Sequence, residues 1–272
     1  MRRRPGLYVG GVGLLLLGAF PLFWMLSTAL KRSDEIFATP PRLVPAHPTL
    51  ENFVRLLRET NFVRFFENSV VVSAATVALT LTVSALGAYA LTRYRFRGRD
   101  TVAGLILLTY MFAPIMIIIP FYVMMRFLGL TNTHLGLILA YTAFCLPFAL
   151  WMLRSFFHAI PLDIEQAAMI DGANRLQTVL YVVLPLAVPG VAATSIFTFI
   201  LAWNDYIFAR ILISADELKT LPVGIADLYN ASVVDWGMIM AAGLLILTPV
   251  LGVFFVIQKY MVTGLGAGAL KG

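Results

Sequence analysis

Few residues in this chain could perform covalent chemistry. Cys145 is the single cysteine and lies within an apolar run, so we expect a buried thiol and no disulfide within the chain. His47, His134 and His158 share no helical face, and the sequence therefore predicts no metal site. Each lysine follows leucine or glutamine, so the Gly-Lys pair of a phosphate-binding loop is missing. We expect no catalytic residue and no cofactor bound by this chain.

The stretch that follows Pro161 has a residue pattern suited to binding another protein. Residues 162–170 predict a short helix, because two acids lie in its first turn, where the helix dipole favours them. Gly172 suits the left-handed residue that ends a helix. Asn174 can then cap a second helix, with Gln177 placed three residues later as in a capping box. The sequence thus predicts a helix–turn–helix segment, which we call the elbow (residues 162–177).

The side chains of the elbow are small on one side and apolar on the other. Ala167 and Ala168 allow another surface to approach closely, while Met169 and Ile170 offer an apolar contact. We interpret the elbow as a docking surface for a second protein.

The amino-acid composition indicates whether the chain that carries the elbow lies in water or in a membrane. Hydrophobic residues make up 60% of the 272 residues, and charged residues make up 12%. A soluble domain is about half apolar and about a quarter charged, so most of the apolar surface here must face lipid. The net charge is +6, but the basic residues gather at the ends of apolar runs. This placement indicates orientation in a membrane and not nucleic-acid binding.

Six apolar stretches predict membrane-spanning helices. Each approaches or exceeds the roughly 20 residues that a helix needs to cross a membrane, and none contains a charged residue. The first is longer than the apolar core of a secretory signal peptide, so we expect it to be retained. Because no alternating pattern of an outer-membrane barrel occurs, the expected fold class is an all-α integral membrane protein. Pro185 and Pro189 either kink the fifth stretch or set where it begins. The expected spans are residues 7–30, 69–92, 101–125, 135–153, 182–204 and 236–258.

Basic residues indicate how the spans are oriented. Arg93, Arg95, Arg97 and Arg99 lie in the link between the second and third spans, and three arginines precede the first span. The positive-inside rule assigns this link and the N-terminus to the cytoplasm, and six spans return the C-terminus there. The elbow then falls in a cytoplasmic loop, residues 157–181, and the external loops are residues 31–68 and 205–235.

The first external loop has a helical pattern of its own. Thr49 can cap a helix that begins at Leu50 and carries an apolar face. We interpret it as an amphipathic helix on the outer membrane surface. A contact surface for an external partner is compatible with this interpretation.

The elbow resembles the EAA loop in the permeases of ATP-binding-cassette (ABC) importers, which are inner-membrane proteins. The pattern of that family is Glu-Ala-Ala, three residues, then Gly, commonly as Asp-Gly-Ala, with Leu-Pro further on. In this chain Gln166 stands where Glu is usual, and Glu165 offers a charge one residue earlier. The matching residues are Ala167, Ala168, Asp171, Gly172 and Ala173, followed by Leu184 and Pro185.

The resemblance covers nearly the whole chain and narrows to carbohydrate-uptake permeases of the maltose-transporter type. The tail is similar to that of the smaller of the two maltose permeases, except that Gly266 stands where Thr is frequent. The segments that carry this resemblance are residues 68–69, 88–98, 203–205, 221–224, 235–237 and 262–272.

This resemblance implies a type I ABC importer permease fold, with residues 1–272 forming a single transmembrane domain. The implied partners are a second homologous permease, two copies of a cytoplasmic ABC ATPase, an extracytoplasmic sugar-binding protein and membrane lipid, without nucleic acid. ATP and Mg²⁺ are then bound by the partner ATPase, so the chain itself is not an enzyme. The implied function is import of an oligosaccharide or disaccharide by alternating access, in a bacterial or archaeal cytoplasmic (inner) membrane.

The same resemblance implies three groups of site residues. The residues that couple the chain to the ATPase are Glu165, Gln166, Ala167, Ala168, Met169, Ile170, Asp171, Gly172, Ala173 and Pro185. The tail residues that contact the ATPase are Gly264, Gly268 and Lys271. The residues that line the translocation path or touch the binding protein are Trp203, Asn204, Asp205, Tyr229 and Asn230.

The sequence leaves two alternative functions open. An importer of a polyol or of glycerol phosphate carries the same motifs. A stand-alone secondary carrier belongs to a different class, which usually places ionisable residues inside its spans. In this chain no span contains one before Asp205, at the outer end of the fifth span. An importer driven by a separate ATPase is therefore favoured.

Overall fold

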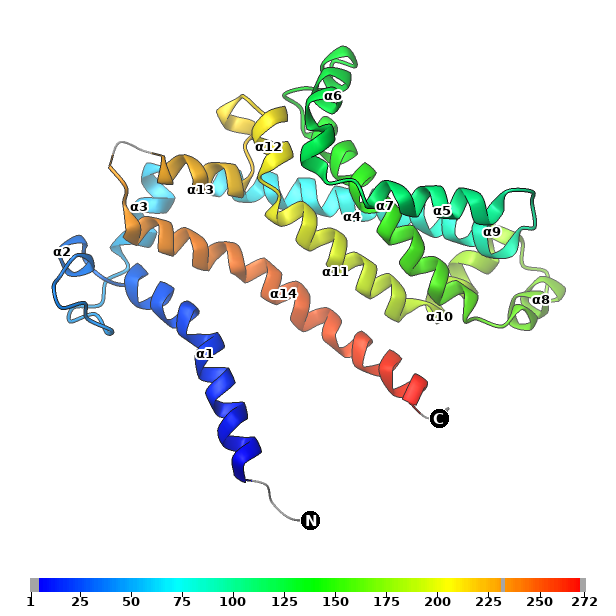
Figure 1. Cartoon of the computed structure of the whole chain (residues 1–272), viewed down its shortest axis with the longest axis horizontal. Coiled ribbons are helices and arrows are strands. Elements are labelled where there is room, and N and C mark those ends of the chain that lie inside the picture. Colours follow the sequence, from blue (N-terminus) through cyan, green and yellow to red (C-terminus); the bar gives the residue numbers. More distant parts are fainter. Residues whose placement is uncertain (1–4, 231–232, 270–272) are drawn as a thin grey trace. The chain divides into compact units, whose positions relative to one another are not determined.

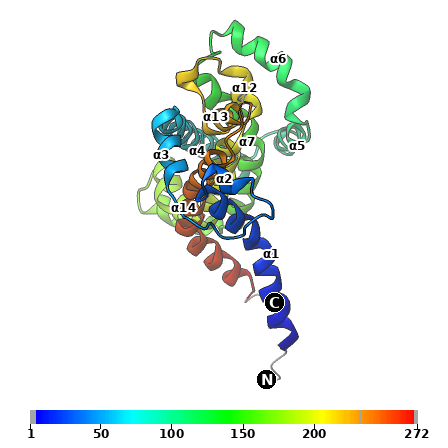
Figure 2. The same ribbon diagram turned by 90° about the vertical axis from the view of Figure 1, so that its left-hand side faces the viewer.

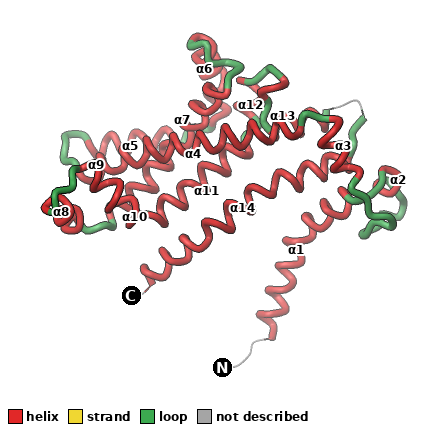
Figure 3. Tube along the Cα trace, turned by 180° about the vertical axis from the view of Figure 1, so that it is seen from behind, coloured by secondary structure: helices red, strands yellow, loops and turns green. Residues whose placement is uncertain are grey.

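The described part of the chain is built from helices. The computed structural model describes residues 5–230 and 233–269, and every regular element within these ranges is helical (Figures 1 and 3). The all-α fold class is confirmed for these residues. The elements are α1 (Pro5–Ala29), α2 (Ser33–Ile36), α3 (Glu51–Glu59), α4 (Phe62–Arg93), α5 (Arg99–Tyr110), α6 (Pro114–Phe127), α7 (His134–His158), α8 (Leu162–Ile170), α9 (Arg175–Thr178), a π-helical turn (Val179–Val183), α10 (Leu184–Leu186), α11 (Val188–Asn204), α12 (Ile207–Leu212), a 3-10 turn (Asp216–Leu218), α13 (Leu221–Tyr229) and α14 (Trp236–Ala269).

Several of these helices are long and apolar enough to cross a membrane. Within the described ranges there are three: α4, α7 and the Trp236–Lys259 part of α14. Two bent pairs, α5 with α6 and Arg175–Leu186 with α11, raise the number to five if each pair is one span. The apolar part of α1, Gly13–Ala29, is shorter. The structure thus supports a multi-pass membrane protein, with three to five spans by length and composition against the six expected.

Sharp bends interrupt the third and fifth expected spans. The axes of α5 and α6 differ by 99°, and Pro114 is the first residue of α6 (Figure 2). A proline drives the residue before it out of the helical region, and Ala113 is accordingly extended. In the fifth span the chain bends by 82° around Ala187, and Pro189 occupies the second position of α11. Pro185 lies before the bend, in the short helix Leu184–Leu186, so the fifth expected stretch is bent and its second helix begins beside Pro189.

The chain divides into two compact units. The first unit comprises Met1–Phe66 with Leu221–Val250, and the second comprises Glu67–Thr220 with Leu251–Gly272. In the second unit α7 packs against α5 and α11. The indole of Trp151 on α7 donates to the carbonyl of Ala103 on α5 at 3.1 Å, and Arg154 pairs with Asp100 at 3.0 Å. α7 therefore forms the centre around which the second unit, with its elbow, is assembled.

Candidate functional site

The first half of the elbow folds as the sequence predicts. α8 spans Leu162–Ile170, and Gly172 has a φ of 94°, in the left-handed region. The N–H groups of Gly172 and Ala173 donate to the carbonyls of Met169 and Ala168 at 3.1 and 3.0 Å, which forms the Schellman motif at the end of a helix. Local backbone bonds therefore determine the turn that follows α8.

The second half of the elbow begins with the predicted capping box. The side chain of Asn174 accepts from the N–H of Gln177 at 2.9 Å, and the side chain of Gln177 accepts from the N–H of Asn174 at 2.8 Å. α9 then runs directly into the π-helical turn Val179–Val183. Such turns often mark functional positions in helices. This one lies between the elbow and the break at Ala187.

α8 presents its apolar side chains to the outside of its unit. Ile170 is 85% exposed and Leu162 is 52% exposed. Gln166 and Ala167 are exposed beside them, and Ala168 is half-buried. An exposed apolar surface of this kind indicates a contact site for another protein or a membrane. The structure therefore gathers most of the predicted docking residues on one exposed helix.

Glu165 is the single buried residue of α8, at 2% exposure. Its Oε1 accepts from Nε of Arg93 at 2.6 Å, and its Oε2 accepts from the Tyr89 hydroxyl at 3.1 Å. Nη2 of Arg93 lies 2.5 Å from Oε1 and donates to the carbonyls of Phe157 and Ile160 at 3.0 Å. We call this arrangement the elbow anchor: Tyr89, Arg93, Glu165 and these two carbonyls. The Glu165 carboxylate is thus buried and paired with Arg93, whereas the sequence suggested a free charge for contact with an ATPase.

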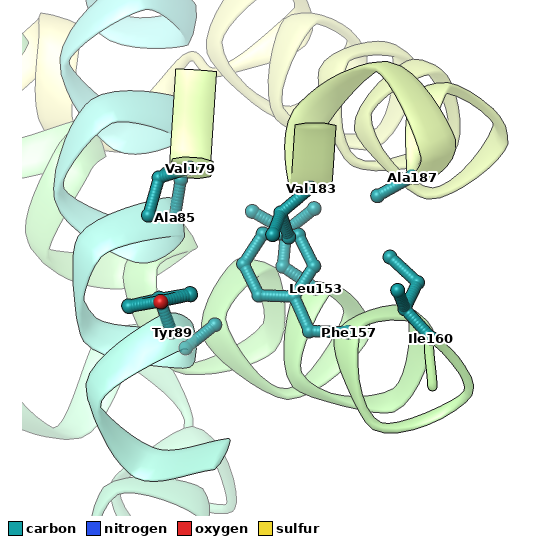
Figure 4. Packing of buried hydrophobic residues seen from close by; sticks show 9 residues of the cluster. Ala85, Tyr89, Leu153, Phe157, Ile160, Val179, Val183 and Ala187 are labelled. Carbon is teal, nitrogen blue, oxygen red and sulfur yellow. The ribbon is translucent and has the colours of Figure 1, made fainter. Parts of the chain in front are cut away.

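An apolar cluster adjoins the elbow anchor. Tyr89 belongs to both, because its ring packs in the cluster while its hydroxyl bonds Glu165. Figure 4 shows Tyr89 and Ala85 of α4 beside Phe157 and Leu153 of α7. The cluster connects α4, α7 and the segment from the π-helical turn to the break at Ala187. Its buried members are Ala85, Ala88, Tyr89, Leu153, Phe157, Ile160, Val179, Val183 and Ala187.

Arg93 and Tyr89 are functional candidates that the sequence analysis missed. From the sequence, the role expected of Arg93 is membrane orientation alone, together with the other arginines of that link. A usable signal exists, because Tyr89 and Arg93 lie four residues apart and so share one face at the end of a span. An arginine on a packed face requires an acidic partner. The sequence gives no direct indication that this partner is Glu165, 72 residues later.

The three residues around the end of α11 differ in environment. Trp203 is 1% exposed, and its ring stacks on that of Phe199 with the ring centroids 5.4 Å apart. Asp205 accepts from the Tyr141 hydroxyl at 2.9 Å and from two N–H groups of α12 at 3.0 and 3.1 Å, and it therefore caps that helix. Asn204 is exposed. Its side-chain amide donates to the carbonyl of Ile200 at 2.9 Å, so of these three residues Asn204 is the exposed one, with one hydrogen bond to its own helix.

A cavity of about 570 Å³ lies beside Asp205 in the second unit. Its wall is mainly apolar and aromatic, and it includes Phe121, Phe144 and Phe208. Tyr141 and Asp205 are among its polar members. A concave site with aromatic walls and a few polar groups is typical of small-molecule binding. The cavity can therefore accept a ligand of modest size.

The remaining predicted residues lie in the second external loop and the tail. Tyr229 is 56% exposed and packs edge-on against Trp236, with ring centroids 6.0 Å apart. Asn230 is exposed next to it. Gly264 and Gly268 lie within α14, and Lys271 lies outside the described residues. Tyr229 and Asn230 are therefore accessible on the first unit.

The predicted amphipathic helix of the first external loop is α3, which begins at Glu51, one residue later than expected. The Thr49 hydroxyl accepts from the N–H of Glu51 at 3.1 Å. Arg55 of this helix pairs with Asp235 at 2.7 Å, and the other oxygen of Asp235 accepts from an N–H in the first turn of α14 at 3.0 Å. Burial lowers the pKa of Arg55, but the hydrogen bond and charge of Asp235 raise it further, so its pKa lies above the ordinary value. The pair thus joins α3 to the start of α14.

Asn52 makes a second junction on the same helix. It is 3% exposed, and its side-chain amide donates to two carbonyls at and just beyond the end of α1, both at 2.8 Å. Gly237 of α14 has no room for a side chain, because a Cβ atom there would meet the Asn52 amide. We call Asn52, Arg55 and Asp235 together the loop anchor. It holds the end of α1, α3 and the start of α14 within the first unit.

Metal binding finds no support in the described residues. Among them, no group of three His, Cys, Asp or Glu side chains could hold a metal ion. Cys145 is buried, which agrees with the expectation for a lone cysteine in an apolar run.

Comparison with known proteins identifies relatives along the whole chain. It is 38% identical over 271 residues to the inner membrane ABC transporter permease protein YcjP of Escherichia coli (strain K12), covering 99% of this chain and 97% of that protein. It is 35% identical over 273 residues to the trehalose/maltose transport system permease protein MalG of Thermococcus litoralis, covering 99% and 98%.

A solved structure and a family description agree with these relatives. The fold is similar to a chain in the crystal structure of a bacterial ABC transporter involved in the import of the acidic polysaccharide alginate, with a TM-score of 0.80 and 28% identity, covering 96% of this chain and 99% of that one. Residues 83–266 match the family described as "Binding-protein-dependent transport system inner membrane component". That range includes the elbow, the elbow anchor and the cavity. The chain therefore belongs to the family of inner-membrane components of binding-protein-dependent transport systems.

Proposed function

We propose that the chain forms one half of the membrane pathway of an ATP-driven, binding-protein-dependent sugar importer that works by alternating access. The family supports the importer class, and relatives named for trehalose and maltose and for alginate support a saccharide as the solute. The observation that carries the proposal is the elbow, an exposed helix whose apolar side chains face away from its own unit.

The proposed assembly contains several partners. A second homologous permease completes the pathway, two copies of an ABC ATPase bind on the cytoplasmic side, and a sugar-binding protein docks on the external loops. ATP and Mg²⁺ belong to the ATPase, so this chain catalyses no bond chemistry. Residues 1–272 form one transmembrane domain in a bacterial or archaeal cytoplasmic membrane. Both termini are cytoplasmic, and α1, α4, α7, α14 and the two bent pairs supply six spans.

In this proposal the exposed face of α8 enters a cleft of the ATPase. Gln166, Ala167 and Ile170 make the contact, and Gly172 provides the turn. Closure of the ATPase on ATP displaces α8, and the displacement reaches α11 through α9, the π-helical turn and α10, where Pro185 lies. The tail from Gly264 adds a further contact with the ATPase.

The same proposal assigns the external and pathway residues. The cavity beside Asp205 forms this chain's share of the path, with Asp205 positioning α12 and Trp203 supporting α11 from within. Asn204 offers an exposed amide to sugar hydroxyls. Tyr229 and Asn230 contact the binding protein.

Co-purification of this chain from its native membrane tests the docking surface. Ile170→Asp places a charge where the apolar contact is expected. Val233→Asp makes the same change at a comparable exposure, 81% against 85%, in the second external loop. We expect the ATPase and a second permease to co-purify with the parent chain and with Val233→Asp, and the ATPase to be lost with Ile170→Asp.

Two outcomes of this experiment would contradict the proposal, each in a different part. Retention of the ATPase by Ile170→Asp contradicts docking through α8. Recovery of the parent chain alone, still able to transport radiolabelled trehalose or maltose after reconstitution without ATP, indicates a stand-alone carrier.

A further inference from the structure

The way in which α8 attaches to its unit is unusual for a surface helix. Such a helix normally buries an apolar stripe and exposes its charged residues. In α8 the apolar residues Leu162, Ile164 and Ile170 are exposed, and the single buried residue is the acid Glu165. The side chain that holds α8 to its unit is therefore a carboxylate.

That carboxylate reaches two other helices through one guanidinium. Arg93 is the last residue of α4, and its Nη2 donates to carbonyls of Phe157 and Ile160, at the C-terminal end of α7 and just beyond it. Carbonyls at a helix C-terminus carry partial negative charge, so they favour a cation. The side chains of Arg93 and Glu165 are 7% and 3% exposed. A buried, multiply hydrogen-bonded pair of this kind has one defined geometry.

The apolar cluster beside the pair extends the same connection. Tyr89 bonds Glu165 through its hydroxyl, and its ring packs with residues of α7 and the π-helical turn (Figure 4). Displacement of α8 therefore acts on α4 and α7 through the elbow anchor as well as on α11 through the backbone.

We propose that Arg93 and Tyr89 are positioning residues of energy coupling, which hold Glu165 so that α8 moves as one body with the adjoining ends of α4 and α7. Glu165 then transmits force within the chain and is not the residue that contacts the ATPase. This inference rests on the proposed function and adds the internal connection that it leaves open.

The test compares two acids of α8 in the complete reconstituted complex. Glu165→Gln removes the buried charge with little change of shape, and Asp163→Asn makes the matching change at an exposed position of the same first turn. The measured quantities are the ATPase that co-purifies, the rate of ATP hydrolysis, and the uptake of radiolabelled trehalose or maltose per ATP. We expect Glu165→Gln to retain the ATPase and to lower uptake per ATP by about tenfold, the factor that corresponds to loss of one charged hydrogen bond.

Asp163→Asn should behave as the parent does. Unchanged uptake per ATP in Glu165→Gln would falsify the positioning role. Loss of the ATPase from a well-folded Glu165→Gln chain also contradicts it, because Glu165 would then act at the docking surface. If Glu165→Gln does not assemble, Tyr89→Phe is the second variant, because it removes one hydroxyl and keeps the packed ring. We expect Tyr89→Phe to lower uptake per ATP by less than tenfold.

A distance measurement separates coupling from stability. Spin labels on cysteines at Asp163 of α8 and Leu86 of α4, both exposed, report whether the two helices move together, in a Cys145→Ser background. We expect the distance to stay constant between ATP-free and ATP-bound states in the parent complex and to change in Glu165→Gln. A distance that changes equally in both overturns the proposal. A parent complex without ATP-dependent uptake contradicts the proposed function instead.

Discussion

The elbow anchor and the loop anchor use the same arginine–carboxylate chemistry in different surroundings. In the elbow anchor the side chains of Arg93 and Glu165 are 7% and 3% exposed, whereas in the loop anchor those of Arg55 and Asp235 are 33% and 25% exposed. Water and salt screen a partly exposed pair, so such pairs contribute little. Removing one partner of a buried pair leaves an uncompensated charge. The elbow therefore depends on its charges far more than the loop does.

The loop anchor depends instead on a neutral side chain. Asn52 is 3% exposed, and its amide satisfies two backbone carbonyls near the end of α1. A contact's burial, and not its formal charge, therefore decides how much of the structure relies on it. Three substitutions test this ordering.

Arg93→Ala should have the largest effect. It leaves the Glu165 carboxylate buried without its cation, which costs about 3–5 kcal/mol of unfolding free energy. The measurement is unfolding in mixed detergent and SDS, followed by tryptophan fluorescence. Arg97→Ala, an exposed arginine of the same link, serves as the control and should change the unfolding free energy little. Equal effects of the two substitutions would contradict the importance of the elbow anchor.

Asn52→Ala should have an intermediate effect. Two carbonyls lose a buried donor, and we expect a loss of about 1–3 kcal/mol in the same assay. Asn230→Ala, at an exposed position, is the matched control. If Asn52→Ala costs no more than its control, the loop anchor does not depend on the buried amide.

Arg55→Gln should have the smallest effect. The pair with Asp235 is partly exposed, so its loss costs about 0.2–1 kcal/mol. The difference from the parent should shrink further as salt is raised, because salt screens exposed charges. Arg58→Gln, on the same helix and exposed, is the control. A loss as large as that of Arg93→Ala would end the distinction between the two anchors.

Local signals allowed much of the elbow to be predicted. The helix Leu162–Ile170, the left-handed Gly172 and the capping box of Asn174 with Gln177 all follow from residues within four positions of one another. Interactions of this range depend little on the rest of the fold. The six expected spans likewise follow apolar runs, although the structure forms the third and the fifth as bent helix pairs.

Long-range contacts could not be predicted in the same way. Arg93 and Glu165 are 72 positions apart, and each has a satisfactory local explanation, one as an orienting charge and the other as a complement to the helix dipole. Trp203 has the features of an interface anchor, yet packing leaves it 1% exposed. Proline at positions 114 and 189 indicates where the helices break, but the bends of 99° and 82° depend on what the following helices pack against.

The two faces of α8 also have an evolutionary consequence. Positions 93 and 165 constrain one another, so a substitution at either should persist among descendants only with compensation at the other. The outward positions, such as 166 and 170, are free of that constraint, and under the proposed docking they can diverge together with the ATPase. One helix can thus change its exposed surface while the buried pair that holds it to its unit is inherited unchanged.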